Sequence, residues 1–62
     1  MTSEGFIVEF HQIGGSIKVT AFDPLTLTEA TIVGSPGVSQ KELAQLAVRK
    51  LLYVMNKEPK DS

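Results

Sequence analysis

The sequence has no cysteine and only one histidine, His11, which excludes two common ways of bracing a small domain. Without cysteine there are no disulfides, and a zinc site built from several cysteines or histidines cannot be assembled. A chain of 62 residues buries only about 60% of the surface that its unfolded form exposes. Its stability is therefore marginal without an additional source of stabilisation. With disulfides and such metal sites excluded, association with a second copy of the chain is the remaining source.

Long apolar runs and a strong charge of one sign are also missing. No segment approaches the roughly 18 consecutive apolar residues of a membrane span, and residues 1–4 lack the basic and apolar character of a signal peptide. Together with the absence of cysteine, this predicts a cytoplasmic protein. The net charge is −1, with acidic residues in excess before residue 39 and basic residues in excess after it. A dedicated nucleic-acid-binding protein usually has a denser basic patch.

Residues 5–23 have the pattern of a β-hairpin. Apolar side chains alternate along two runs, about 5–12 and 16–23, with the period of half-buried strands. The pair Gly14-Gly15 between them supplies the positive φ angles of a tight turn. Ile7 and Phe22 alternate out of phase with the other apolar residues, so we expect both on the opposite face of the sheet.

A third strand and one helix complete the prediction. Asp23-Pro24 ends the second strand, and a third run at about 28–34 precedes a Gly/Ser/Pro loop. Ser39 and Glu42 have the spacing of a capping box, which predicts a helix over about 39–57 and a frayed tail at 58–62. The sequence therefore predicts one α+β domain spanning 1–62. Its fold is a three-stranded antiparallel meander followed by a C-terminal helix packed on one face (βββα).

The predicted helix has an apolar stripe nearly twice as wide as one sheet face usually covers. Lys50 alone interrupts it, and its aliphatic stem can lie along apolar surface. Contiguous exposed apolar surface marks an interface, and two-fold homodimers are the commonest oligomers. We therefore expect a homodimer, formed through strand edges or through helices, and a monomer with scattered apolar surface residues is the alternative. The predicted dimer or partner interface comprises Ile7, Phe22, Val48, Leu52 and Met55.

No arrangement of residues in the sequence predicts catalysis, a metal site or a cofactor. His11 and Glu9 share a strand face, where a solvated polar cluster is a more economical interpretation than a catalytic pair. Asp23 and Glu29 flank a threonine-rich loop, but their spacing lacks the dense carboxylates of a calcium loop, and turn capping explains Asp23. We expect a protein that is not an enzyme.

The basic residues of the helix leave a second hypothesis open. Lys41, Arg49 and Lys50 could contact phosphates or a partner, and Tyr53 lies one helical turn from Arg49. A local contact between Tyr53 and Arg49 is the favoured interpretation. The order of elements resembles the C-terminal two-thirds of a double-stranded RNA-binding domain, whose last helix begins with basic residues. Here the matching segment SQKEL has one lysine beside a glutamate, and that family's first helix has no counterpart.

A second resemblance covers nearly the whole chain. The segments VEFHQIGGSIKVTAFDP and TEATIVGS, followed by LAVRKLLYVM, resemble a family of short proteobacterial proteins of unknown function. The resemblance implies a small cytoplasmic α+β protein of bacteria and assigns no functional residue. The function predicted from the sequence is a non-enzymatic homodimeric protein-interaction module. The alternative is weak nucleic-acid binding, and neither the physiological partner nor a ligand at a dimer seam can be inferred from sequence.

Overall fold

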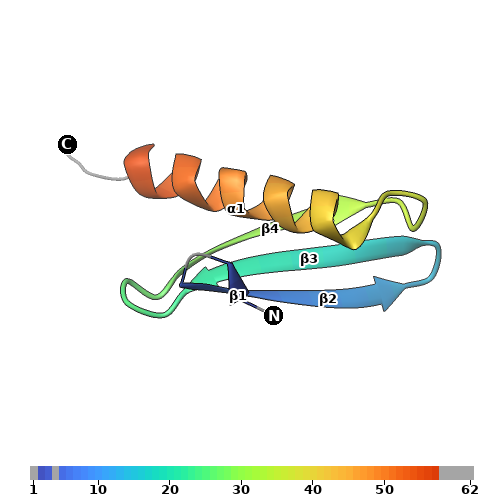
Figure 1. Cartoon of the computed structure of the whole chain (residues 1–62), viewed down its shortest axis with the longest axis horizontal. Helices are drawn as coiled ribbons and strands as arrows, with labels where there is room; N and C mark the ends of the chain where they lie inside the picture. Colours follow the sequence, from blue (N-terminus) through green and yellow to red (C-terminus); the bar gives the residue numbers. More distant parts are fainter. Residues whose placement is uncertain (1, 4, 58–62) are drawn as a thin grey trace.

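The computed structural model describes residues 2–3 and 5–57, so the predicted tail at 58–62 lies outside the described residues. The strands form one antiparallel sheet in the order β1-β2-β3-β4, and the helix packs against one face of it (Figure 1). The elements are β1 (Thr2–Ser3), β2 (Phe6–Ile13), β3 (Ser16–Asp23), β4 (Thr28–Gly34) and α1 (Gln40–Lys57). The predicted meander and helix are confirmed, and the two-residue strand β1 was not predicted.

The β2–β3 hairpin forms where the glycine pair predicts it. Ile13 lies opposite Ser16, so Gly14 and Gly15 are the two residues of the loop. Gly14 has a φ of 59°, and Gly15 is not among the residues with positive φ. A two-residue hairpin turn that needs positive φ only at its first central position is of the II′ kind, whose twist matches that of the strands. Glycine at position 14 therefore sets the register of β2 against β3.

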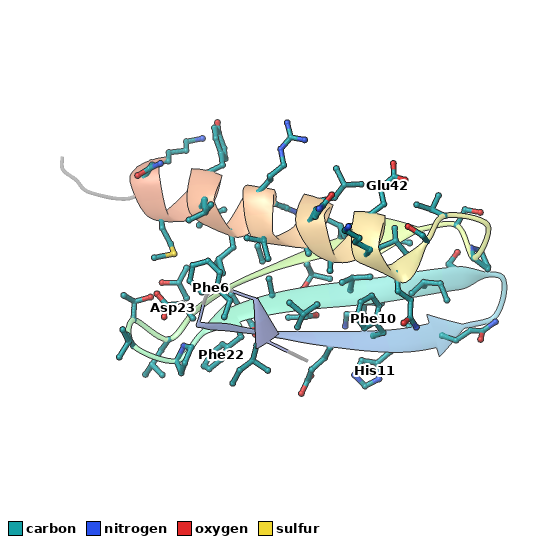
Figure 2. The ribbon with its side chains drawn as sticks, in the orientation of Figure 1. Phe6, Phe10, His11, Phe22, Asp23 and Glu42 are labelled. Carbon is teal, nitrogen blue, oxygen red and sulfur yellow. The ribbon has the colours of Figure 1, made fainter. Side chains whose placement is uncertain are left out.

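Alternation along the strands separates two faces of the sheet. The helix-facing side chains stand in layers across the three long strands, with Val8 beside Ala21 and Phe10 beside Val19. The inward face of the third strand, which the sequence left open, is the one with Ala30 and Ile32, since these lie opposite Ala21 and Val19. Figure 2 shows Phe10 between β2 and the helix, and His11 on the opposite side of the sheet. The buried core is Val8, Val19, Ala21, Ala30, Leu43, Ala44, Ala47, Val48 and Leu51.

The helix begins with the predicted cap. The Glu42 backbone N–H donates to Ser39 Oγ at 3.1 Å, and the Leu43 N–H donates to the Ser39 carbonyl at 3.0 Å. The Ser39 side chain thus satisfies one of the four N–H groups that a helix start leaves without a partner. Val38, next to the cap, packs against the core as a hydrophobic staple requires.

Most of the wide apolar stripe is covered by the chain's own sheet. Val48 is 8% exposed and belongs to the buried core, so a single chain already covers this predicted interface residue, while Met55 is half-buried and packs against the core. Ala44 and Ala47 are buried at the centre of the stripe, and short side chains there let the helix approach the sheet closely enough for the flanking residues to reach it. Leu52 does remain at the surface, with 41% of its area exposed.

Two contacts place α1 over the β4 side of the sheet. A Cβ atom added at Gly34, the last residue of β4, would overlap the buried side chain of Leu43. Two helical turns after Leu43, Lys50 Nζ donates to the Thr31 carbonyl of β4 at 2.7 Å. The helix accordingly packs more extensively on β4 and β3 than on β2, and Figure 1 shows β2 farthest from it.

Replacing Gly34 with alanine should lower the free energy of unfolding by about 1–3 kcal/mol, since the new methyl group overpacks a site where Leu43 cannot move freely. Urea denaturation monitored by circular dichroism measures the change. Gly15→Ala is the matched control, because nothing lies within 4 Å of a Cβ there. Equal stabilities for the two variants would contradict the role given to this contact.

Candidate functional site

The polar cluster predicted on the exposed sheet face is present but shallow. His11 Nε2 lies 3.8 Å from Glu9 Oε1, with 62% and 67% of the two side chains exposed. Across the strands, Glu9 lies opposite Thr20, and the hydroxyls of Thr20 and Thr31 are 3.1 Å apart. A general base needs a substrate held within hydrogen-bond reach and shielded from water, and this face offers no enclosure. The cluster is a solvated sheet face.

Asp23 closes the β3–β4 loop with both of its carboxylate oxygens. Oδ1 accepts from the Leu25 N–H at 3.0 Å, and Oδ2 accepts from the Thr26 hydroxyl at 3.1 Å. Asp23 lies opposite Thr28 while Phe22 lies opposite Glu29, so the two carboxylates are on different faces of the sheet. Turn capping by Asp23 is confirmed. Within the described residues, no group of three or more His, Asp or Glu side chains could hold a metal ion.

The same loop carries two leucines that the sequence analysis did not single out. Leu25 is 92% exposed and Leu27 is 73% exposed. Leu27 also has a φ of 63°, in the left-handed region that leucine rarely adopts. Its N–H donates to the Asp23 carbonyl at 2.7 Å, so the turn itself imposes this conformation. Glycine or asparagine would fit the same backbone at lower cost.

The predicted interface residues fall on three different surfaces. Ile7 and Phe22 are cross-strand neighbours on the face of the sheet that the helix leaves open, where Ile7 is exposed and Phe22 half-buried. Figure 2 shows Phe22 on this side of the sheet. Val48 belongs to the buried core, Met55 packs against that core while half-buried, and Leu52 lies exposed on a flank of α1. The structure therefore does not bring the five together. Leu46, Val33 and Ile13 are exposed apolar residues that the prediction omitted.

The basic residues of α1 are separated from one another by their contacts. Lys50 is held at the β4 edge by the Thr31 carbonyl. The predicted partner of Tyr53 is Arg49. In the structure the cation over the Tyr53 ring is Lys57, whose Nζ is 5.4 Å from the ring centroid. Lys41 and Arg49 line a broad, open depression of about 710 Å³ along α1, together with Glu42. The negative charge of Glu42 lowers the positive electrostatic potential that Lys41 and Arg49 create in this depression.

The least covered part of the helix-facing side lies above β2. Phe6 and Phe10 point toward the helix layer but are only partly buried, because α1 lies toward β4. A groove of about 340 Å³ opens beside Phe10, between the end of the β2–β3 hairpin and the start of the helix. Leu52 follows Lys50 by two positions, about 200° around the helix axis, so it lies on the flank away from the β4 contact and above the β2 side. We call Phe6, Phe10 and Leu52 the β2-side trough.

Comparison with known proteins places this fold in a family. Residues 3–58 match the model of a domain of unknown function, DUF6898. The chain belongs to that family. The match covers most of the chain and agrees with the resemblance to an uncharacterised family noted from the sequence. No curated protein and no solved structure matches the chain. Among the described residues, no helix combines the length and apolar character needed to cross a membrane.

Family membership gives no residue a role, so the candidate site rests on geometry. The candidate surface is the β2-side trough, which lies beside the edge of β2 that has no partner strand from Val8 onward among the described residues. Sequence reasoning missed Phe10 because strand alternation assigns it to the core face. One indication in the sequence that a helix-facing residue such as Phe10 could stay partly exposed is that a single helix is narrower than a sheet of three strands.

Replacing Leu27 with asparagine should raise the free energy of unfolding by about 0.5–1 kcal/mol, since asparagine tolerates the left-handed conformation and little buried area is lost. Thermal and urea denaturation of the purified variants check this. Leu25→Asn is the control in the same loop, at a position that is also exposed but has no positive φ, and a change within about 0.5 kcal/mol is expected there. A loss of stability in Leu27→Asn would show that the leucine side chain makes a stabilising contact.

Proposed function

We propose that the chain is a non-enzymatic homodimeric protein-interaction module. The observation that carries the proposal is the β2-side trough, where two phenylalanines of the helix-facing layer and one helix leucine are left partly uncovered by a single copy. Apolar surface that is contiguous and lies beside an open strand edge is the kind of surface that associates. A second copy offers the same surface, so both troughs are covered at once in a two-fold dimer.

The chemistry of the described side chains favours association over catalysis. The histidine–carboxylate pair lies on a flat face in contact with water, and the buried carboxylate, Asp23, is occupied by the loop that it caps. The grooves along α1 and beside Phe10 are lined by lysine, arginine, glutamine, serine and apolar residues, with one carboxylate, Glu42. The serine is Ser39, whose hydroxyl oxygen already accepts the Glu42 N–H as the helix cap, so it serves the fold and is not an activated nucleophile paired with a base.

Nucleic-acid binding is the alternative, and it has a distinct experimental signature. Binding through Lys41, Arg49, Lys50 and Lys57 would weaken steeply with salt, because each phosphate contact releases a counterion. Of these four, Lys50 and Lys57 already have partners within the chain. Fluorescence anisotropy with labelled double-stranded RNA at two salt concentrations separates this alternative from protein association.

The solution mass of the untagged protein tests the proposal. Sedimentation equilibrium over a wide concentration range should give a dimer. Leu52→Glu should weaken the dimer by about tenfold or more, since a charge in the trough loses its water on association. Leu46→Glu is the matched control, because Leu46 is also 41% exposed but lies on the flank of α1 near Lys50, and it should leave the dimer intact.

A monomeric wild-type protein at all concentrations would overturn the homodimer. If the wild-type protein is a dimer and Leu46→Glu and Leu52→Glu change its dimer affinity equally, the homodimer stands but its interface does not lie at the trough.

A further inference from the structure

The two edges of the sheet differ in how they are protected. A strand at an edge has unpaired N–H and C=O groups that can pair with another chain, and lysine at an edge is a common way to prevent this. At the β4 edge, Lys50 Nζ donates a hydrogen bond to the Thr31 carbonyl in the middle of the strand, so this carbonyl is not free to pair with another chain. At the opposite edge, β1 pairs with β2 only at Phe6 and Ile7, so β2 has no partner strand from Val8 onward in the described structure (Figure 1).

The Lys50 contact also reveals which backbone groups of β2 face outward. The N–H and C=O of one residue point to the same side of an antiparallel strand, and successive residues alternate. The Thr31 carbonyl points away from β3, so its neighbour Thr20 directs its own groups toward Glu9 of β2. Glu9 is therefore bonded within the sheet. The backbone groups of Val8, Phe10 and Gln12 then point out of the sheet with no strand beside them.

Resting on the homodimer proposed above, we infer that β2 pairs antiparallel with β2 of a second copy, with the two-fold axis at Phe10. In this register Phe10 lies opposite the partner's Phe10, and Val8 lies opposite the partner's Gln12. These are the outward-facing residues, so each of them forms a hydrogen-bonded pair across the seam. The two sheets join into one continuous sheet, with both helices on the same face.

Charge selects this register among its neighbours. Glu9 and His11 lie on the open face, one on each side of Phe10, so each Glu9 lies directly opposite the partner's His11. These are non-hydrogen-bonded pairs, in which side chains across the strands approach most closely. A two-fold axis at Glu9 would place Glu9 opposite the partner's Glu9, and like charges in that position are destabilising. Of these two registers, the one with the axis at Phe10 pairs unlike side chains and is self-complementary.

The helix-facing side supplies the apolar part of the seam. The two Phe10 side chains meet across the axis on the helix-facing side of the sheet, over the part of β2 that α1 does not reach, and the groove beside Phe10 lies on the same side. Leu52 lines the flank of each helix above this seam. Strand β1 limits the pairing to residues 8–12, because it already occupies the edge at Phe6 and Ile7. In this register the partner's Ile13 falls opposite Ile7, the position that Thr2 of β1 takes, so the end of the partner's hairpin bends away from the seam after Gln12.

Proline substitutions at matched positions test the edge. Gln12→Pro removes an N–H that points outward from β2, and Val33→Pro removes one that points outward from β4, so neither costs a hydrogen bond within the chain. Both side chains are exposed. In sedimentation equilibrium, Gln12→Pro should weaken the dimer by about tenfold or more, and Val33→Pro should leave it unchanged. The reverse order of effects would overturn the inference.

Disulfide trapping tests the register without weakening the fold, and the chain has no cysteine of its own to interfere. Glu9→Cys and His11→Cys are refolded together and oxidised mildly. The expected product is the disulfide-linked heterodimer of the two variants, while each variant alone stays uncrosslinked. Homodimers of Glu9→Cys as the main product would move the axis to Glu9 and overturn the register.

The outcomes separate this inference from the proposed function. A wild-type protein that is monomeric overturns both. A wild-type dimer that keeps its affinity in Gln12→Pro, and shows no preference for the mixed disulfide, overturns the β2 pairing alone and leaves the homodimer standing.

Discussion

The seating of Leu43 over Gly34 is the contact on which the arrangement of the molecule depends. A side chain at Gly34 would push the first turns of α1 away from β4, and without it the buried leucine settles directly on the strand end. Lys50 then reaches the Thr31 carbonyl two turns later and holds the same lateral position. One lateral position of the helix explains three features: a protected β4 edge, an unprotected β2 edge and a trough of half-covered aromatic residues.

A chain of this length has only two layers, and one helix must cover a sheet of three long strands. Short side chains at Ala44 and Ala47 make the covered area as wide as it is, because the helix lies close to the sheet. What remains uncovered is the strand farthest from the helix. The uncovered apolar surface of the described residues is thus set by where the helix cannot reach.

Several local features were predictable because their causes are local. Ser39 caps the helix, Gly14 allows the tight β2–β3 turn, and Asp23 caps the β3–β4 loop. Each of these residues acts on the backbone within a few positions of itself in the sequence. The left-handed conformation of Leu27 was not predictable, since leucine gives no signal for it. It arises because the Asp23 turn fixes the chain at both ends of a short loop. The partner of Tyr53 was missed for a similar reason, as Arg49 and Lys57 are each one turn away.

The sequence by itself determined the three long strands and the helix, and which face of β2 and β3 a side chain occupies. Period-two and period-3.6 patterns encode these directly, and the phase of Ile7 and Phe22 came out correctly. Only the tertiary structure decided that Val48 is buried, that Leu52 is not, and that β2 has the open edge. Periodicity gives the direction of a side chain around its own element but does not say where the helix axis lies across the sheet. That position depends on contacts between residues far apart in sequence, such as Leu43 with Gly34 and Lys50 with Thr31.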